Sequence, residues 1–201
     1  MENRTIKNLV RKEIREKREN LTQDEKEKLS SAIREKFLNI SEVKNAEVVM
    51  SYMDFKNEVE TRNINEILVK NGKKVLVPRV SEDKEKIIPV EVTGEYRKGN
   101  FGIEEAEGND FLNGKIDIVI VPGIAFNEKG GRIGFGKGYY DKFFSEREKN
   151  GDKILKISLA YDFQIDNRFK EEKHDKNVDI IITEKRIIKV SYWKNFFCMI
   201  K

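Results

Sequence analysis

The densest group of residues that could do chemistry lies at 130–144, Gly-Gly-Arg-Ile-Gly-Phe-Gly-Lys-Gly-Tyr-Tyr-Asp-Lys-Phe-Phe. Five of the chain's 13 glycines fall in this stretch, and Arg132 and Lys137 stand among them. Glycine lets a backbone turn sharply and aim successive N–H groups at an anion. An apolar run at 118–121 ends just upstream, and a helix is expected just downstream. A strand, a glycine-rich turn and a helix in this order predict a phosphate site.

This stretch matches neither of two common phosphate-binding patterns. A Walker A loop needs Ser or Thr after Gly-Lys, but Gly138 follows Lys137. The dinucleotide pattern Gly-x-Gly-x-x-Gly fails because the third glycine comes one residue early. The alternative is a flexible surface loop without a ligand. The Tyr-Tyr-Asp sequel argues against that alternative, because a nucleotide–magnesium site can use two aromatic rings and a carboxylate.

Composition narrows the classes of protein. At 201 residues the chain is expected to form a single domain with a sizeable core. Its 40 basic residues balance 36 acidic ones and form no block, so no nucleic-acid partner is expected. One cysteine, Cys198, and one histidine, His174, exclude an internal disulfide and a His-Glu-x-x-His zinc site. No apolar run approaches the ~20 residues of a membrane span, so we expect a cytoplasmic protein with no membrane partner.

The spacing of apolar residues predicts the elements that must position the glycine-rich stretch. It indicates helices over 3–20, over a segment capped by Thr22, over 62–70 and over about 138–149. Short apolar runs predict strands at 46–52, 74–78, 87–92, 117–121, 155–160 and 178–183. The order of these elements favours an α/β fold, a single layered domain with a mostly parallel central sheet flanked by helices.

The end of the chain, from about residue 186, is unusually apolar for a terminus, with Trp193, Phe196 and Phe197 close together. We expect this extension to pack back on the domain and the protein to be a monomer. The alternatives are a weak dimer through the extension or a peripheral membrane contact.

Several parts of the sequence resemble the 5-formyltetrahydrofolate cyclo-ligase family, also called the 5,10-methenyltetrahydrofolate synthetases. The most specific resemblance is Pro122-Gly123-x-Ala125-Phe126, followed by Gly130-x-Arg132-x-Gly134-x-Gly136-x-Gly138-Tyr139-Tyr140-Asp141. Further segments follow in the family's order: Lys7 to Arg11, Tyr52 to Thr61, Gly99 to Glu104, Ala160 to Gln164 and His174 to Asp179. The resemblance spans roughly residues 5–184, and the apolar extension lies outside it.

The resemblance implies an ATP- and Mg²⁺-dependent enzyme. It would cyclise 5-formyltetrahydrofolate, a small molecule, to 5,10-methenyltetrahydrofolate, with release of ADP and phosphate. The formyl oxygen would be phosphorylated by ATP, and N10 would then attack the formyl carbon. Such chemistry needs positioning and charge neutralisation more than a histidine or thiol nucleophile. Two alternatives stay open: a non-catalytic module that binds nucleotide or RNA, and an ATP-dependent enzyme for another small substrate on the same fold.

The resemblance also assigns residues to the nucleotide. Arg132 and Lys137 are the implied catalytic cations, and the alternative for Arg132 is a salt bridge that anchors its loop. Lys7 and Arg11, at i and i+4 on one helix face, would clamp phosphates, and the alternative for this pair is a solvated face. The implied ATP-binding residues are Lys7, Arg11, Arg132, Gly134, Phe135, Gly136, Lys137, Gly138, Tyr139 and Tyr140.

The metal and folate residues come from the same resemblance. Asp141 and Asp179 are the implied Mg²⁺ ligands. The alternative for Asp141 is a first-turn carboxylate favoured by the helix dipole, and Asp179 is expected inside an apolar strand. Glu58 would accept hydrogen bonds from the pterin ring, with helix capping as its alternative. The implied folate-binding residues are Met53, Phe55, Glu58, Tyr139 and Tyr140, and the alternative for the aromatic ones is core packing.

Overall fold

The computed structural model describes residues 2–94, 96–98, 104–172 and 175–190. The helices are α1 (Asn3–Glu19), α2 (Gln23–Asn39), α3 (Ser41–Asn45), α4 (Arg62–Lys70), α5 (Tyr139–Lys149) and the 3-10 helix η2 (Asp162–Gln164). The strands are β1 (Val48–Met50), β2 (Lys74–Val80), β3 (Ile87–Glu91), β4 (Tyr96–Lys98), β5 (Glu104–Ala106), β6 (Ile118–Ile120), β7 (Ala125–Phe126), β8 (Arg132–Ile133), β9 (Leu155–Leu159), β10 (Ile180–Ile182) and β11 (Ile187–Lys189). Within these residues, no helix combines the length and apolarity needed to cross a bilayer.

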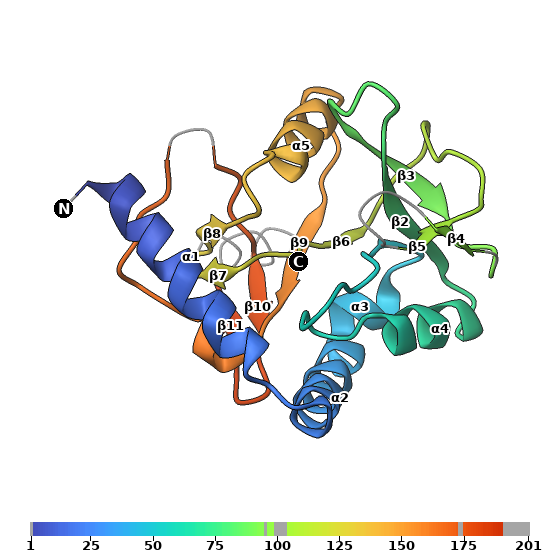
Figure 1. Ribbon diagram of the computed structural model, residues 1–201. Helices are drawn as coiled ribbons and strands as arrows, with labels where there is room; N and C mark the ends of the chain where they lie inside the picture. The colour runs from blue at the N-terminus through green and yellow to red at the C-terminus, as the bar shows by residue number, and fades with distance from the viewer. Residues whose placement is uncertain (1, 95, 99–103, 173–174, 191–201) are drawn as a thin grey trace, which may run out of the picture.

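A seven-stranded sheet runs through the centre of the molecule in the order β11-β10-β9-β6-β1-β2-β3 (Figure 1). The five inner strands pair in parallel, and the two edge strands, β3 and β11, are antiparallel to their neighbours. The predicted α/β fold with a mostly parallel sheet is therefore confirmed. The short hairpins β4–β5 and β7–β8 lie outside this sheet, and their two or three residues gave no periodic signal in the sequence.

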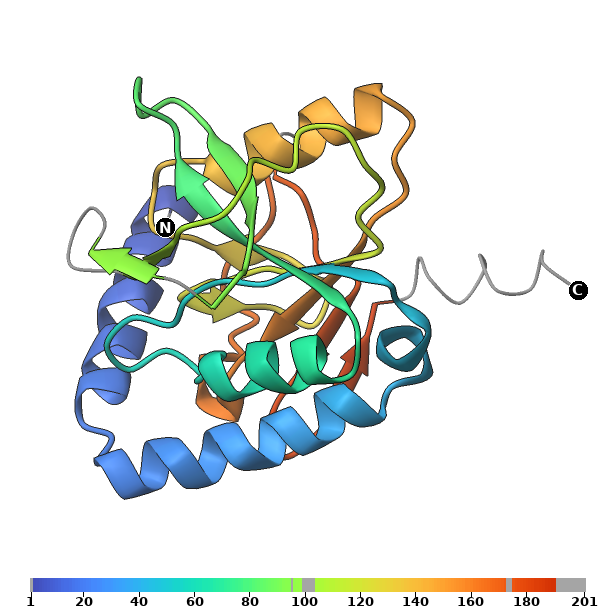
Figure 2. The same cartoon turned by 90° about the vertical axis from the view of Figure 1, so that its right-hand side faces the viewer.

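Helices cover both faces of the sheet, as Figures 1 and 2 show, with α5 on one face and α2, α3 and α4 on the other. Residues 118–121 form an unbroken apolar run because β6 is buried on both faces of the sheet. Ile118 and Ile120 pack into the cluster under α2–α4, whereas Val119 packs into the cluster under α5. A strand buried on both faces has no side left for polar residues.

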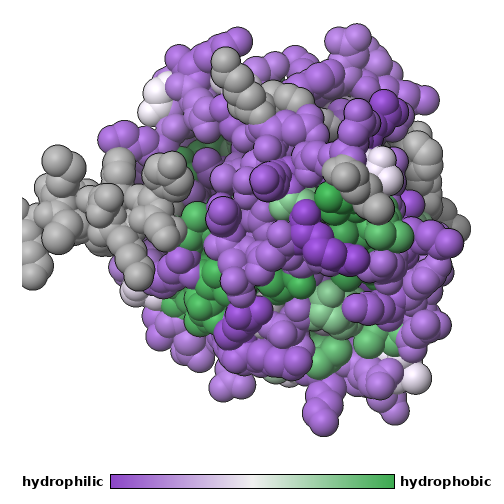
Figure 3. Space-filling model, turned by 90° about the vertical axis from the view of Figure 1, so that its left-hand side faces the viewer, coloured by the Kyte–Doolittle hydropathy of each residue, from purple (hydrophilic) through white to green (hydrophobic). Residues whose placement is uncertain are grey.

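Helix α1 packs on the β7–β8 hairpin and not on the main sheet. Val10 and Ile14 are buried against Ile124 and Ile133. Leu9 of the same helix is 42% exposed. Seen from the α1 side, the surface is mainly hydrophilic with apolar patches between the charged side chains (Figure 3). This packing matters because it brings one face of α1 to the glycine-rich stretch.

Two local predictions are confirmed. Thr22 caps α2 in a capping box with Glu25, and α4 has the predicted bounds. The apolar extension expected from about residue 186 begins with the edge strand β11, whose Ile187 pairs with Ile182 of β10. The rest of the extension, 191–201, lies outside the described residues, and so does His174. The packing of the extension on the domain therefore stays a prediction.

Candidate active site

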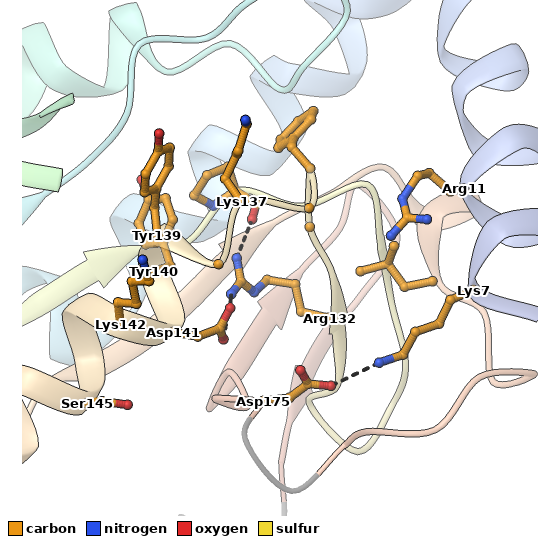
Figure 4. A pocket seen from close by; sticks show the side chains of 16 residues that line it. Lys7, Arg11, Arg132, Lys137, Tyr139, Tyr140, Asp141, Lys142, Ser145 and Asp175 are labelled. Carbon is orange, nitrogen blue, oxygen red and sulfur yellow. Dashed lines mark hydrogen bonds and ion pairs between the residues drawn. The ribbon is translucent and has the colours of Figure 1, made fainter. Parts of the chain in front are cut away.

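A cavity of about 550 Å³ opens just beyond the carboxyl end of β6 (Figure 4). It lies between α1, the start of α5 and the segment that we call the glycine loop, residues 134–138. Open α/β sheets place ligand sites at this edge. The lining residues are Lys7, Arg11, Pro122, Arg132, Ile133, Gly134, Phe135, Gly136, Lys137, Gly138, Tyr139, Tyr140, Asp141, Lys142, Ser145 and Asp175.

Gly130 and Gly131 stabilise the β7–β8 turn, whereas Gly134, Gly136 and Gly138 line the cavity. Gly130 has a φ of +87°, and a Cβ there would lie 2.4 Å from the carbonyl oxygen of Val178. The N–H of Val178 also donates to the Gly130 carbonyl. Next to it, the N–H of Gly131 donates to Asn127 Oδ1 at 2.8 Å. These contacts fix the β7–β8 turn, so the glycine loop leaves the hairpin from a rigid base.

The glycine loop itself is open. A Cβ at Gly136 or Gly138 would meet no other atom within 4 Å. Gly138 is the N-cap of α5, and no side chain caps the first-turn N–H groups of this helix. Uncapped N–H groups at a helix N-terminus carry partial positive charge and suit an anion. The backbone here can therefore receive a phosphate.

Arg132 and Asp141 form an ion pair at the floor of the cavity. Arg132 Nη2 lies 3.0 Å from Asp141 Oδ1 and 3.1 Å from Oδ2. The backbone N–H of Lys176 also donates to Asp141 Oδ1. The salt bridge that was the alternative for Arg132 is thus present, and so is the first-turn position of Asp141. Arg132 still has capacity to spare, because its buried Nε has no hydrogen-bond partner among the described residues.

The other cations of the cavity differ in how they are held. Lys7 Nζ lies 2.9 Å from Glu172 Oε1 and 3.1 Å from Asp175 Oδ2. Burial acts to lower the pKa of Lys7, but the hydrogen bonds that Lys7 donates to these two carboxylates outweigh it and raise the pKa above its usual value. Lys137 is exposed on the glycine loop, and no ion pair or hydrogen bond joins it to the described part of the chain. Lys137 is therefore the cation most ready to take an external anion.

Glu58 lies in the loop between β1 and α4, outside the lining of the cavity. Its Oε2 accepts from the N–H of Phe55 at 3.1 Å, and its Oε1 is 3.9 Å from Arg18 Nη2. The helix-capping alternative for Glu58 is wrong, because Asp54 Oδ1 accepts from the N–H groups of Thr61 and Arg62 at the start of α4.

Two tyrosines interact with Glu58: Tyr140, which lines the cavity, and Tyr161. Burial raises the pKa of the Tyr140 hydroxyl, Arg132 opposes this, and the charge of Glu58 adds to it. The Tyr140 hydroxyl is also buried without a hydrogen-bond partner among the described residues. Tyr161 donates its hydroxyl to the Glu58 carbonyl at 3.1 Å, and burial raises the pKa of Tyr161 to about 12. Tyr140 therefore lines the cavity with an unused polar group and responds to the charge of Glu58.

The sequence profile of the 5-formyltetrahydrofolate cyclo-ligase family matches residues 3–184. The chain belongs to this family. The predicted family, and with it a ligase of folate one-carbon metabolism as the class of enzyme, is confirmed.

Relatives of known name agree over nearly the whole chain. The 5-formyltetrahydrofolate cyclo-ligase of Mycoplasma pneumoniae is 30% identical over 181 residues, which cover 89% of this chain and 99% of that protein. The mouse 5-formyltetrahydrofolate cyclo-ligase is 25% identical over 87% of this chain and 92% of its own. Among solved structures, the 5,10-methenyltetrahydrofolate synthetase of Aquifex aeolicus has a TM-score of 0.80 at 32% identity and covers 92% of this chain and 93% of that one.

For a cyclo-ligase family member, the cavity collects the residues that the sequence linked to ATP. All ten of them line it, and Asp141 lines it too. Met53, Phe55 and Glu58 do not, although Tyr139 and Tyr140 from the predicted folate set do. Met53 packs partly against Val77 and Val90. The structure thus brings together the residues predicted to bind ATP. The other predicted folate residues, Met53, Phe55 and Glu58, lie in the loop between β1 and α4.

Asp179 is placed differently from the prediction. It stands one residue before β10 and not within it, and it is not among the residues that line the cavity. Its Oδ2 accepts from the N–H of Lys156 at 2.7 Å, which explains how this half-buried charge is tolerated beside apolar neighbours. Its assignment to Mg²⁺ together with Asp141 stays a prediction.

Five lining residues have no role in the sequence interpretation: Pro122, Ile133, Lys142, Ser145 and Asp175. Lys142 and Ser145 follow Gly138 and Asp141 at i+4 on α5, so helical spacing could have identified them. Asp175 comes from a distant loop and reaches the cavity through its ion pair with Lys7. The segment from His174 to Asp179 resembles the family, but that resemblance gave Asp175 no role.

Proposed function

We propose that this protein is a 5-formyltetrahydrofolate cyclo-ligase that converts 5-formyltetrahydrofolate and ATP to 5,10-methenyltetrahydrofolate, ADP and phosphate. One observation carries the proposal. In a chain of this family, a single cavity collects all ten residues expected to bind ATP, from α1, the glycine loop and α5.

The residues of the cavity fit a nucleotide triphosphate. Lys137 and the buried Nε of Arg132 have no polar partner among the described residues, and both can donate to phosphate oxygens. The open glycine loop leaves room for the phosphates beside the first-turn N–H groups of α5. Lys7, Arg11, Arg132 and Lys137 would hold the phosphates, and Asp141 with Asp179 would hold Mg²⁺.

Bound Mg-ATP supplies the phosphoryl group that makes the formyl oxygen a leaving group. The residues of the chain then have to position the reacting groups and to neutralise the negative charge that develops. Lys137 and Arg132 lie where negative charge builds up, and a cation ~4 Å from such a charge contributes on the order of 4 kcal/mol at a partly shielded site. Asp141 holds the Arg132 guanidinium in the orientation that the cavity needs.

On the folate side, Glu58 accepts hydrogen bonds from the donors of the pterin ring. Its carboxylate is fixed in place by the N–H of Phe55. Met53, Phe55, Tyr139 and Tyr140 supply apolar and aromatic surface to the ring. Tyr140 borders both ligands, since it lines the cavity and its hydroxyl responds to the charge of Glu58. N10 and the formyl carbon would be held together between these two sets of contacts.

The test mixes the protein, Mg-ATP and 5-formyltetrahydrofolate, and records the near-ultraviolet absorbance of the conjugated methenyl product. We expect product only when both ATP and Mg²⁺ are present. A non-catalytic module would bind ATP and give no absorbance, and an enzyme for another substrate would turn over ATP only with that substrate. Either result would overturn the proposal. The monomeric state and the cytoplasmic location stay predictions.

A further inference from the structure

Arg18 is a buried cation outside the cavity. It lies near the carboxyl end of α1, 8% exposed, and is not among the residues that line the cavity. Lys7 on the same helix is eleven residues away, which is about 16 Å along an α-helix. Arg18 is therefore too far along the helix to share the phosphate site with Lys7, and its burial needs another explanation.

The side chain of Arg18 contacts the loop that carries Glu58. Arg18 Nε donates to the Asn57 carbonyl at 3.0 Å, and Asn57 Nδ2 donates back to the Arg18 carbonyl at 2.7 Å. Arg18 Nη2 lies 3.9 Å from Glu58 Oε1. One side chain thus holds the backbone of the loop and faces its carboxylate.

We propose that Arg18 is a positioning residue for the folate: it fixes the Asn57–Glu58 segment and keeps the Glu58 carboxylate ionised, as acceptance of hydrogen bonds from the pterin donors requires. This proposal rests on the proposed function. It adds a residue that acts on substrate affinity through Glu58, without contact with the nucleotide.

The charges around Glu58 show why a cation is needed there. Burial raises the pKa of Glu58 above its usual value, and Arg18 is the largest influence against it, followed by the N–H of Phe55. Asp54 in the same loop pushes the pKa further up, and Lys26 of α2 pulls it down. Lys26 is itself engaged by Asp54 and Glu60, at 3.8 and 3.5 Å.

Tyr52 and Tyr140 also interact with the charge of Glu58, and burial raises the pKa of both hydroxyls. Arg18 is thus the cation with the strongest hold on this carboxylate. A carboxyl that gains a proton becomes a donor on one oxygen and can no longer accept there.

The experiment separates the charge of Arg18 from its hydrogen bond. Arg18→Gln keeps a donor for the Asn57 carbonyl and removes the charge, whereas Arg18→Lys keeps the charge. Lys17→Gln, at an exposed neighbour on the same helix, is the matched control. For each variant, kcat/KM for 5-formyltetrahydrofolate is measured against pH, together with KM for ATP.

We expect Arg18→Gln to move the acid limb of the kcat/KM profile to higher pH by about one unit, with a loss of about tenfold on that limb. KM for ATP should stay within about twofold, since the nucleotide set is untouched. Arg18→Lys and Lys17→Gln should keep the wild-type limb. In a Glu58→Gln background, Arg18→Gln should no longer move the limb, because the group that it acts through is gone.

A limb that moves equally in Arg18→Gln and Arg18→Lys would overturn the proposal, as would a profile of Arg18→Gln that equals wild type. If circular dichroism shows that Arg18→Gln does not fold, Arg18→Lys decides: an unmoved limb supports the proposal and a moved one contradicts it. A wild-type protein that forms no methenyl product would instead refute the proposed function itself, so the two failures are distinguishable.

Discussion

The two proposed sides of the site are the phosphate side, around Lys137 and the glycine loop, and the folate side, around Glu58. They hold their charges in opposite ways. On the phosphate side, Lys137 is exposed and unpaired within the described residues, and the glycine loop is open. On the folate side, the charged side chains of Arg18, Lys26 and Glu58 are only 9%, 10% and 11% exposed. Each of them has an opposite charge within 4 Å. The exposed cation of the phosphate side can pair with the charge of a ligand, whereas the buried charges of the folate side are already paired within the protein.

This difference predicts how the two sides respond to mutation. An exposed cation without a partner contributes little to folding, so its loss should appear in activity alone. A buried, paired charge influences both activity and stability, because its removal ends its own desolvation cost and also leaves its partner unpaired. The following changes test that contrast, from the largest expected effect to the smallest.

The largest effect should follow Lys137→Ala. We expect kcat/KM to fall by about 100-fold, which is the scale for loss of one preorganised partner of a developing charge. The melting temperature of the protein without ligand should not change. Lys149→Ala, which removes an exposed lysine at the other end of α5, is the control and should leave turnover unchanged. Near-wild-type turnover of Lys137→Ala at saturating ATP would show that Lys137 does not contact the phosphates.

Asp141→Asn and Asp179→Asn test the metal assignment. Each should raise the Mg²⁺ concentration for half-maximal rate, by about 10- to 100-fold, and the double substitution should add less than the sum. Glu146→Gln, at an exposed acid of α5, is the control. Asp179 also accepts from the N–H of Lys156, a bond that asparagine can retain through its carbonyl oxygen. An unchanged Mg²⁺ response in Asp179→Asn would make Asp179 a structural residue at the start of β10.

The same contrast explains which parts of the site the sequence could reveal. The phosphate side is encoded locally, because Gly136, Lys137, Gly138 and the start of α5 follow one another in the chain. Local rules also found α4 and the Thr22 cap. They wrongly placed Asp179 within a strand, although β10 begins one residue later, at Ile180. The error arose because Asp179 has apolar residues on both sides in the sequence.

The folate side depends on pairs that are distant in the sequence. Arg18 meets Asn57 across 39 positions, and Tyr161 meets the Glu58 carbonyl across 103. Arg18 stands in a basic amphipathic helix among the exposed Lys12, Arg15 and Lys17, so its type and neighbours do not distinguish it. Only the packing of α1 on the β7–β8 hairpin, and of its end on the Glu58 loop, singles it out.

Glu58→Gln should weaken folate binding and stabilise the protein without ligand. The amide replaces one acceptor by a donor, and a mismatched polar group costs about 1–3 kcal/mol, so we expect KM for 5-formyltetrahydrofolate to rise on the order of tenfold. KM for ATP should be unchanged.

The stability effect of Glu58→Gln has a defined pH dependence. Burial raises the pKa of Glu58 in the folded protein, so the ionised carboxylate destabilises the fold. The gain in melting temperature from Gln should therefore be absent below the ordinary glutamate pKa of ~4.3, grow as pH rises through the folded pKa, and then stay constant. Melts of wild type and variant across this range measure it. A variant that is less stable at neutral pH would mean that the pair with Arg18 outweighs the burial of the charge.

The smallest effect should come from Gly138→Ala. Its comparison with Gly130→Ala tests whether the two ends of the glycine motif differ in packing. Gly138 has a φ of +66°, and a Cβ there would meet nothing within 4 Å, so alanine costs only the left-handed backbone, ~1 kcal/mol. Reduced entropy of the unfolded chain offsets part of that loss, and the melting temperature should fall by no more than ~3 °C. Gly130→Ala is the matched comparison, since its Cβ would lie 2.4 Å from the Val178 carbonyl oxygen and the turn must move. Thermal melts should show Gly130→Ala as clearly the less stable of the two. Equal losses would mean that the glycine loop is packed as firmly as the turn, and the contrast between an open phosphate side and a filled folate side would then fail.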